Sequence, residues 1–201
     1  MAVNFKMVVG LGNPTAQYEH TRHNAGFWFL DEVAAHHRVA LHREQRFQGV
    51  VGKLEWAGST VLLLKPMTYM NRSGLSVGAV ARYFHIQPAE ILVAHDELDL
   101  APGVVRLKRG GGHGGHNGLR DLMAHLGSPD FHRLRFGIGH PGDRAAVIAY
   151  VLGVPDPSER SLIEQAIAKA VVLLPELLVS PLEMVMNQLH AGSPPSGKKV
   201  S

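Results

Sequence analysis

Two polar residues that lie far apart in the sequence could together perform general-base chemistry. His23 directly precedes a predicted helix, and Asp96 directly follows a short apolar run. A carboxylate in contact with an imidazole orients the ring and stabilises its protonated form, so His23 could take a proton from water. His23 could also be a surface or capping histidine, since the chain has 13 histidines, and Asp96 could be a loop residue.

Residues 10–14 read Gly-Leu-Gly-Asn-Pro and place Asn13 after the first predicted strand. The two glycines suggest a dinucleotide-binding loop, but we reject that interpretation. The third glycine of the motif G-x-G-x-x-G would fall at Thr15, and Pro14 would interrupt the phosphate-binding turn. Turn geometry explains the two glycines but says less about Asn13.

A second asparagine, Asn71, lies in residues 66–74, just before another predicted helix that Ser73 is expected to cap. An asparagine side chain offers two donors and an acceptor, which suits the binding of an amide or a carbonyl group. The nearby methionines Met67 and Met70 are expected to be core or lining residues rather than part of a cofactor site.

The glycine-rich segment 110–118 is the most unusual part of the sequence. It contains His113, His116 and Asn117 among six glycines. Glycine lets a ligand approach backbone N–H groups closely and makes a loop mobile. A flexible connector would have the same composition, but the embedded polar residues favour a functional loop. His113 and His116 have the spacing of a metal-binding pair, yet zinc ligands usually lie on firmer elements with a third ligand nearby, so we expect no metal.

The charge distribution indicates a polyanionic partner. The formal net charge is +3, and residues 104–144 hold seven basic residues against three acidic ones, which gives 7 − 3 = +4 in this stretch. The cluster lies beside the glycine-rich loop, although any single lysine or arginine could simply be solvated. The basic residues are Arg106, Lys108, Arg109, Arg120, Arg133, Arg135 and Arg144.

Composition excludes several classes of protein. Hydrophobic residues make up 45% and charged residues 18% of the chain, which is typical of a globular domain. The absence of cysteine excludes disulfides, thiolate-bound zinc and a cysteine nucleophile. No apolar run approaches the ~20 residues that span a bilayer, and the N-terminus does not resemble a secretory signal. We therefore expect a cytoplasmic protein.

Hydrophobic periodicity predicts alternating strands and helices. Strands are expected at residues 5–9, 47–56, 60–64, 91–94, 104–108 and 134–138, the last of them half-exposed. Helices are expected at residues 24–38, 77–84, 119–126, 143–152, 156–174 and 182–190, with Pro175 ending the fifth. We expect residues 1–190 to form one α/β domain with a twisted, mostly parallel (mixed) sheet flanked by helices, and residues 191–201 to form a disordered tail.

The polar clusters described above follow the first, third and fourth of these strands. Asn13, residues 67–71 and Asp96 would then lie at the C-terminal ends of the strands, where α/β folds bind their ligands.

These segments resemble the bacterial-type peptidyl-tRNA hydrolases. The matching residues are 10–18, 21–26, 65–74, 95–103, 106–118 and 131–141, and the similarity runs from about Met7 to the last predicted helix. Two departures are Thr15, where the family often has glycine, and Ala101, where proline is common. Neither replaces a polar site residue.

The resemblance implies metal-free and cofactor-free hydrolysis of peptidyl-tRNA by a protein that we expect to be a monomer. His23 would be the catalytic base and Asp96 its orienting partner, with loop 110–118 as a gate over the peptide channel. The implied substrate-binding residues are Asn13, Tyr18, Asn24, Met70, Asn71, His116 and Asn117. The implied tRNA-binding residues are Arg106, Lys108, Arg135 and Arg144.

Three other functions remain in competition. The basic cluster would also suit a non-catalytic RNA-binding module. His113, His116 and His140 could serve a metal-dependent hydrolase. A serine hydrolase is disfavoured because the motif G-x-S-x-G is absent.

Overall fold

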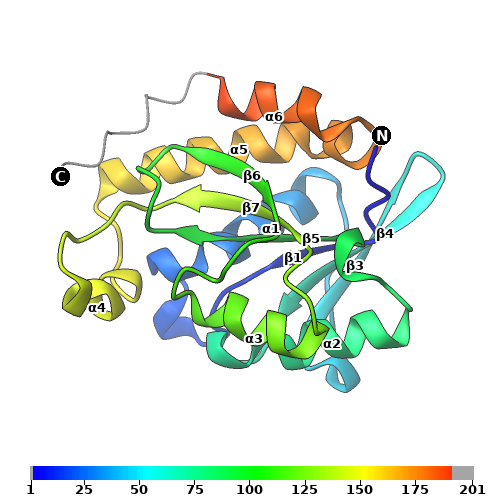
Figure 1. Ribbon diagram of the computed structural model, residues 1–201, viewed down its shortest axis with the longest axis horizontal. Coiled ribbons are helices and arrows are strands. Elements are labelled where there is room, and N and C mark those ends of the chain that lie inside the picture. Colours follow the sequence, from blue (N-terminus) through cyan, green and yellow to red (C-terminus); the bar gives the residue numbers. More distant parts are fainter. Residues whose placement is uncertain (1, 192–201) are drawn as a thin grey trace.

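The computed structural model describes residues 2–191 of the 201-residue chain as a single α/β unit built on a seven-stranded sheet (Figure 1). The strand order is β2-β3-β4-β1-β5-β7-β6. The strands are β1 (Met7–Gly10), β2 (His42–Glu44), β3 (Gly49–Trp56), β4 (Ser59–Pro66), β5 (Ile91–Glu97), β6 (Val105–Arg109) and β7 (His132–Gly137). The predicted strands are confirmed, and β2 is an additional short edge strand.

The four central strands β4, β1, β5 and β7 are parallel, whereas β2, β3 and β6 pair antiparallel at the two edges. The mixed, mostly parallel sheet predicted from the sequence is therefore confirmed. Because the C-terminal ends of parallel strands meet at one edge, this arrangement brings the residues that follow β1, β4 and β5 to the same side of the molecule.

Helices cover both faces of the sheet, and each face has its own core. The helices are α1 (Ala25–His36), α2 (Ser73–Tyr83), α3 (Asn117–Leu126), α4 (Val147–Val151), α5 (Pro157–Val179) and α6 (Leu182–His190). One core joins α1, α5 and α6 to the sheet, and the other joins α2 and α3 (Figure 1). Strand β1 contributes to both, because Val8 faces the first core and Met7 and Val9 face the second.

Three local predictions were wrong. Helix α5 does not stop at Pro175 but continues to Val179. A proline within a helix costs ~3 kcal/mol. The last turn of α5 buries Leu177 and Leu178, and burying each leucine contributes about 1.5–3 kcal/mol, which is enough to offset that cost.

Ser73 does not cap α2 but is its first residue, with Arg72 at the capping position. The Ser73 hydroxyl donates instead to the Met70 carbonyl (2.8 Å), and the Asp121 carboxylate accepts the free N–H of Gly74 (2.7 Å). Strand β7 is not half-exposed, because five of its six residues are buried, Arg133 among them.

Within the described residues, no helix is long and apolar enough to cross a membrane. Apart from Ala191, the tail predicted to be disordered lies outside the described residues.

Candidate active site

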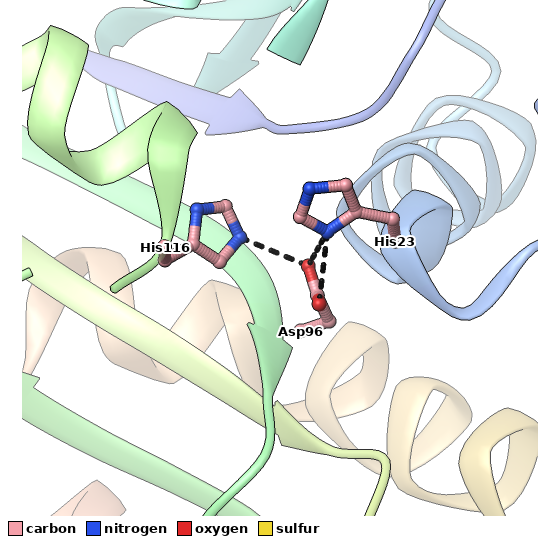
Figure 2. Close-up of side chains that lie close together, drawn as sticks. All are labelled: His23, Asp96 and His116. Carbon is pink, nitrogen blue, oxygen red and sulfur yellow. Dashed lines mark hydrogen bonds and ion pairs between the residues drawn. The ribbon is translucent and has the colours of Figure 1, made fainter. Parts of the chain in front are cut away.

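Three side chains from distant parts of the chain meet at the C-terminal edge of the central strands (Figure 2). Asp96 is the penultimate residue of β5, and His23 lies in the short 3-10 turn Arg22–Asn24 that leads into α1. His116 precedes α3 as its capping residue. The sequence predicted the encounter of His23 with Asp96, and the structure confirms that the two side chains are in contact.

Close packing of α1 against the sheet makes this contact possible. A Cβ atom on Gly26, the second residue of α1, would lie 2.3 Å from the carbonyl oxygen of Ala94 in β5. One on Gly10 would lie 2.3 Å from the carbonyl oxygen of Gly26. Only glycine permits such an approach, so these two positions bring the turn that carries His23 next to the end of β5.

Asp96 accepts hydrogen bonds from both histidines. His23 Nδ1 lies 3.0 Å from both carboxylate oxygens, and His116 Nε2 lies 2.9 Å from Oδ1. His116 Nδ1 accepts the backbone N–H of Leu119 (3.3 Å), so its proton must be on Nε2, facing Asp96. His23 likewise donates through Nδ1, which leaves its Nε2 with a lone pair. Figure 2 shows that this nitrogen points away from Asp96.

The electrostatics of the cluster favour an ionised Asp96. Burial raises its pKa, but the charges and hydrogen bonds of His23 and His116 outweigh this effect and bring the pKa well below its usual value. Burial lowers the pKa of His23, whereas the charge and hydrogen bond of Asp96 raise it, and the net pKa is raised. His23 is thus a stronger base than an isolated histidine.

His95, which the sequence analysis did not single out, is a buried neighbour of this cluster. Its Nδ1 donates to the backbone carbonyl of Asp96 (2.7 Å), and its ring packs edge-on against His116 at 5.0 Å. Burial and the nearby His116 lower the pKa of His95 to about 3, so it stays neutral.

Arg22, another residue that the sequence analysis did not assign, fixes the turn that carries His23. Its guanidinium lies 2.6 Å from Glu159 Oε2 and stacks at 4.1 Å on the ring of Tyr150, and its backbone N–H donates to Gly153. A three-residue turn cannot hold itself in place, so contacts with α4 and α5 supply the support. Its position next to His23 was the only signal in the sequence.

Asn13 and Asn24 bind each other across the site. The backbone N–H of Asn13 donates to Asn24 Oδ1 (2.8 Å), and Asn24 Nδ2 donates to the Asn13 carbonyl (3.0 Å). Asn13 Oδ1 in turn accepts the backbone N–H of Met70 (2.8 Å). All three residues are buried, and together they link the loops that follow β1 and β4.

The other predicted substrate-binding residues line a more open region. Asn71 and Asn117 are exposed, and Tyr18 is half-buried. Asn117 begins α3, and its side-chain oxygen accepts a hydrogen bond from Arg120 (3.2 Å). The side chains of Asn71 and Asn117 are thus more accessible to a ligand than those of the buried Asn13 and Asn24.

Comparison with known proteins identifies the family of this chain. The family model described as peptidyl-tRNA hydrolase matches residues 7–198. The chain belongs to the peptidyl-tRNA hydrolase family.

Relatives in this family are similar over nearly their whole length. A peptidyl-tRNA hydrolase of Methylococcus capsulatus is 57% identical, with 92% of this chain and 98% of the relative aligned. One from Pectobacterium atrosepticum is 53% identical, with 94% and 97% aligned. The crystal structure of peptidyl-tRNA hydrolase from Acinetobacter baumannii has a TM-score of 0.92 at 48% identity and covers 96% of this chain and 98% of its own. The resemblance inferred from sequence motifs is confirmed.

Three of the four cations that the family resemblance assigns to tRNA lie on β6 and β7, and β7 pairs with β5, the strand that carries Asp96. Arg106 and Lys108 on β6 are in register with Arg135 and Arg133 on β7, so all four point to the same face of the sheet. Lys108 is exposed, Arg106 and Arg135 are partly exposed, and Arg135 lies 3.8 Å from Glu97. Arg144 is exposed at the start of the 3-10 turn before α4. Arg133 differs from these cations because it is buried.

Of the potential metal ligands considered from the sequence of this member of the peptidyl-tRNA hydrolase family, only His116 belongs to a group of possible ligands within residues 2–191 of the structure. His23, Asp96 and His116 have ligand atoms within 4.8 Å of one another. Among the residues that the structure describes, no such group of three or more includes His113 or His140. The hypothetical site of His113, His116 and His140 is therefore wrong.

Proposed function

We propose that this protein hydrolyses the ester bond between the peptide and the 3′-terminal ribose of tRNA in peptidyl-tRNA. The products are free tRNA and a free peptide, and the reaction recycles tRNA from stalled or aborted translation in the cytoplasm. One observation carries the proposal: in a chain of this family, His23 contacts a buried, ionised Asp96 while its second ring nitrogen remains available.

The reaction begins with attack of water on the ester carbonyl. His23 Nε2 takes a proton from the water, and Asp96 holds the ring through Nδ1 and stabilises the imidazolium that forms. The tetrahedral intermediate then collapses as the bond to the ribose oxygen breaks, and His23 returns the proton to that oxygen. An ester needs less activation than an amide, so a base and well-placed donors suffice.

The asparagines bind the peptide without reading its side chains. The Oδ1 atom of Asn13 is occupied by Met70, which fixes the amide and leaves its N–H groups for a substrate carbonyl. Asn71 and Asn117 are exposed and suit the peptide backbone and the attacking water. The remaining proposed contacts are Tyr18, Asn24, Met70 and His116.

The basic face contributes affinity for tRNA through its phosphates. We assign this role to Arg106, Lys108, Arg135 and Arg144. Neutralisation of phosphates releases counterions, so binding weakens as the salt concentration rises. We further propose that the protein works as a monomer and needs no metal or cofactor, because His23 and Asp96 supply the base without one.

The test is release of tRNA from an N-acetylated aminoacyl-tRNA, with excess chelator present. Wild type should turn over fully, whereas His23→Ala should lose kcat by about 10²–10⁴-fold while still binding tRNA. His20→Ala is the matched control, because His20 is exposed and three residues away, and it should behave as wild type.

Near-normal turnover by His23→Ala would remove His23 as the base. Binding of tRNA by wild type without any release would instead favour the RNA-binding module. Loss of wild-type activity in chelator would contradict metal independence.

A further inference from the structure

Arg133 is a buried cation without a carboxylate partner. Its residue is only 3% exposed, and within residues 2–191 no carboxylate oxygen lies within 4.0 Å of its nitrogens. Its Nε has no hydrogen-bond partner. Burying a charge is costly unless it is paired or hydrogen-bonded, so the hydrogen bonds that Arg133 does make are important for its stability in this position.

The partners of Arg133 are backbone carbonyls of the glycine-rich loop 110–118. Nη1 donates to the carbonyl of Gly112 (2.7 Å) and Nη2 to that of Gly111 (2.5 Å). The planar guanidinium thus bonds two successive carbonyls from two separate nitrogens, a geometry that the single ammonium nitrogen of a lysine does not reproduce. Arg133 shares the basic face of β6 and β7, and the loop covers it there.

The loop has few other attachments. Among residues 2–191, these two bonds are the only hydrogen bonds that tie Gly111–Gly115 to residues outside the loop. Within it, Gly115 N–H donates to His113 Nδ1 and His116 N–H to the His113 carbonyl. Gly110, Gly111, Gly114 and Gly115 all have positive φ angles, so this backbone is easily deformed.

The loop ends at the active site. His116 follows Gly115 directly and donates Nε2–H to Asp96, and Asn117 comes next. A change in the path of Gly111–Gly115 would therefore move the residue that shares the Asp96 carboxylate with His23.

We propose that Arg133 is a positioning residue that fixes the glycine-rich loop through two backbone carbonyls and thereby places His116 and Asn117 at the active site. Arg133 does not touch the substrate in this scheme. The effect on turnover rests on the function proposed above, whereas the effect on the loop does not.

The experiment compares Arg133→Ala and Arg133→Lys with wild type, using amide hydrogen exchange and hydrolysis of N-acetylated aminoacyl-tRNA. In Arg133→Ala, the Gly115 and His116 amides should exchange about tenfold faster or more, because their bonds depend on an ordered loop. We expect kcat to fall roughly 10–100-fold with a smaller change in KM, since a displacement of ~1 Å can cost that much. Arg133→Lys should be intermediate.

Free guanidinium at millimolar concentration should restore kcat and amide protection in Arg133→Ala but should not affect wild type. Arg109→Ala is the matched control, because Arg109 also adjoins the loop but is exposed and pairs with Asp130 (2.7 Å). It should leave both measurements unchanged.

Wild-type exchange of Gly115 and His116 in either folded Arg133 variant would overturn the proposal, whatever the activity. If Arg133→Ala does not fold, Arg133→Lys decides by the same measurement. Accelerated exchange in an enzyme that proved not to hydrolyse peptidyl-tRNA would uphold the loop assignment and refute only the proposed function.

Discussion

The two halves of the site differ in how firmly their side chains are held. At its base, Asn13, His23, Asn24 and Asp96 are buried, and each has hydrogen bonds to another site residue. At its rim, Asn71 and Asn117 are exposed, and the adjoining loop is held mainly by Arg133. In the proposed reaction, the buried half would keep the proton-transfer geometry fixed, whereas the rim would adapt to peptides of different sequence. Fixed geometry contributes to rate, and adaptable contacts contribute to binding of varied substrates.

The largest expected loss of kcat follows substitution of Asp96, at the centre of the buried, rigid half of the site. Asp96→Asn should lower kcat on the order of 10³-fold, because the new amide would present an N–H group to His23 Nδ1 and force its proton onto Nε2. Steady-state kinetics on N-acetylated aminoacyl-tRNA measures this loss. Asp99→Asn, which changes an exposed carboxylate outside the cluster, is the control. A variant at position 96 with more than a tenth of wild-type kcat would contradict the role of the rigid half.

The pH dependence of kcat/KM should reflect the interaction between His23 and Asp96. His23 must be neutral to act as a base, and its pKa is raised, so the acidic limb of kcat/KM should lie above pH 6.5. In Asp96→Asn the attraction disappears and burial still lowers the pKa of His23, so the limb should move to lower pH. His95 cannot account for the limb, since its pKa is about 3. The residual activity of the variant is measured from pH 5 to pH 9, and a limb that does not move would disconnect Asp96 from the base.

Alanine substitutions of one asparagine in each half of the site should differ in their effect on the free energy of unfolding. Asn13→Ala leaves the buried N–H of Met70 without its acceptor, which costs about 1–3 kcal/mol. For a domain of this size each kcal/mol lowers Tm by about 2–4 °C. Asn117→Ala removes an exposed side chain and should change the free energy of unfolding by less than about 0.5 kcal/mol. Thermal denaturation of both variants tests this, and equal losses would abolish the distinction.

A smaller effect is expected on the basic face. Arg135→Glu should raise KM about tenfold and lower kcat less, because phosphate contacts act on binding and are screened by salt. Arg38→Glu introduces the same charge change at an exposed position on α1's C-terminal side and serves as the control. An unchanged KM at physiological salt would remove Arg135 from the tRNA-binding surface.

Sequence patterns predicted most of the fold, because β5 and β4 are apolar runs and α3 and α6 have clear periodicity. They also placed Asp96 at the edge of the sheet where polar residues gather in an α/β fold, and the family resemblance implied its pairing with His23. Tertiary packing decided the rest. The alternation of polar and apolar residues in β7 could not show that the glycine-rich loop 110–118 covers Arg133 while Arg135, two residues away, stays partly exposed. Burial in the core similarly allows α5 to continue past Pro175. No local sequence pattern indicates the hydrogen bond between His116 and Asp96 or the contacts by which Arg22 supports the turn that carries His23.

The close contact between Gly10 and Gly26 limits which residues can replace them. A single methyl group at either position would need space that the backbone atoms of β5 or α1 already occupy. The chain could relieve that overlap by shifting α1 outward, and His23 would then retreat from Asp96 along with it. The distance between the imidazole of His23 and the carboxylate of Asp96 thus depends on the packing at Gly10 and Gly26, where a single added carbon atom does not fit.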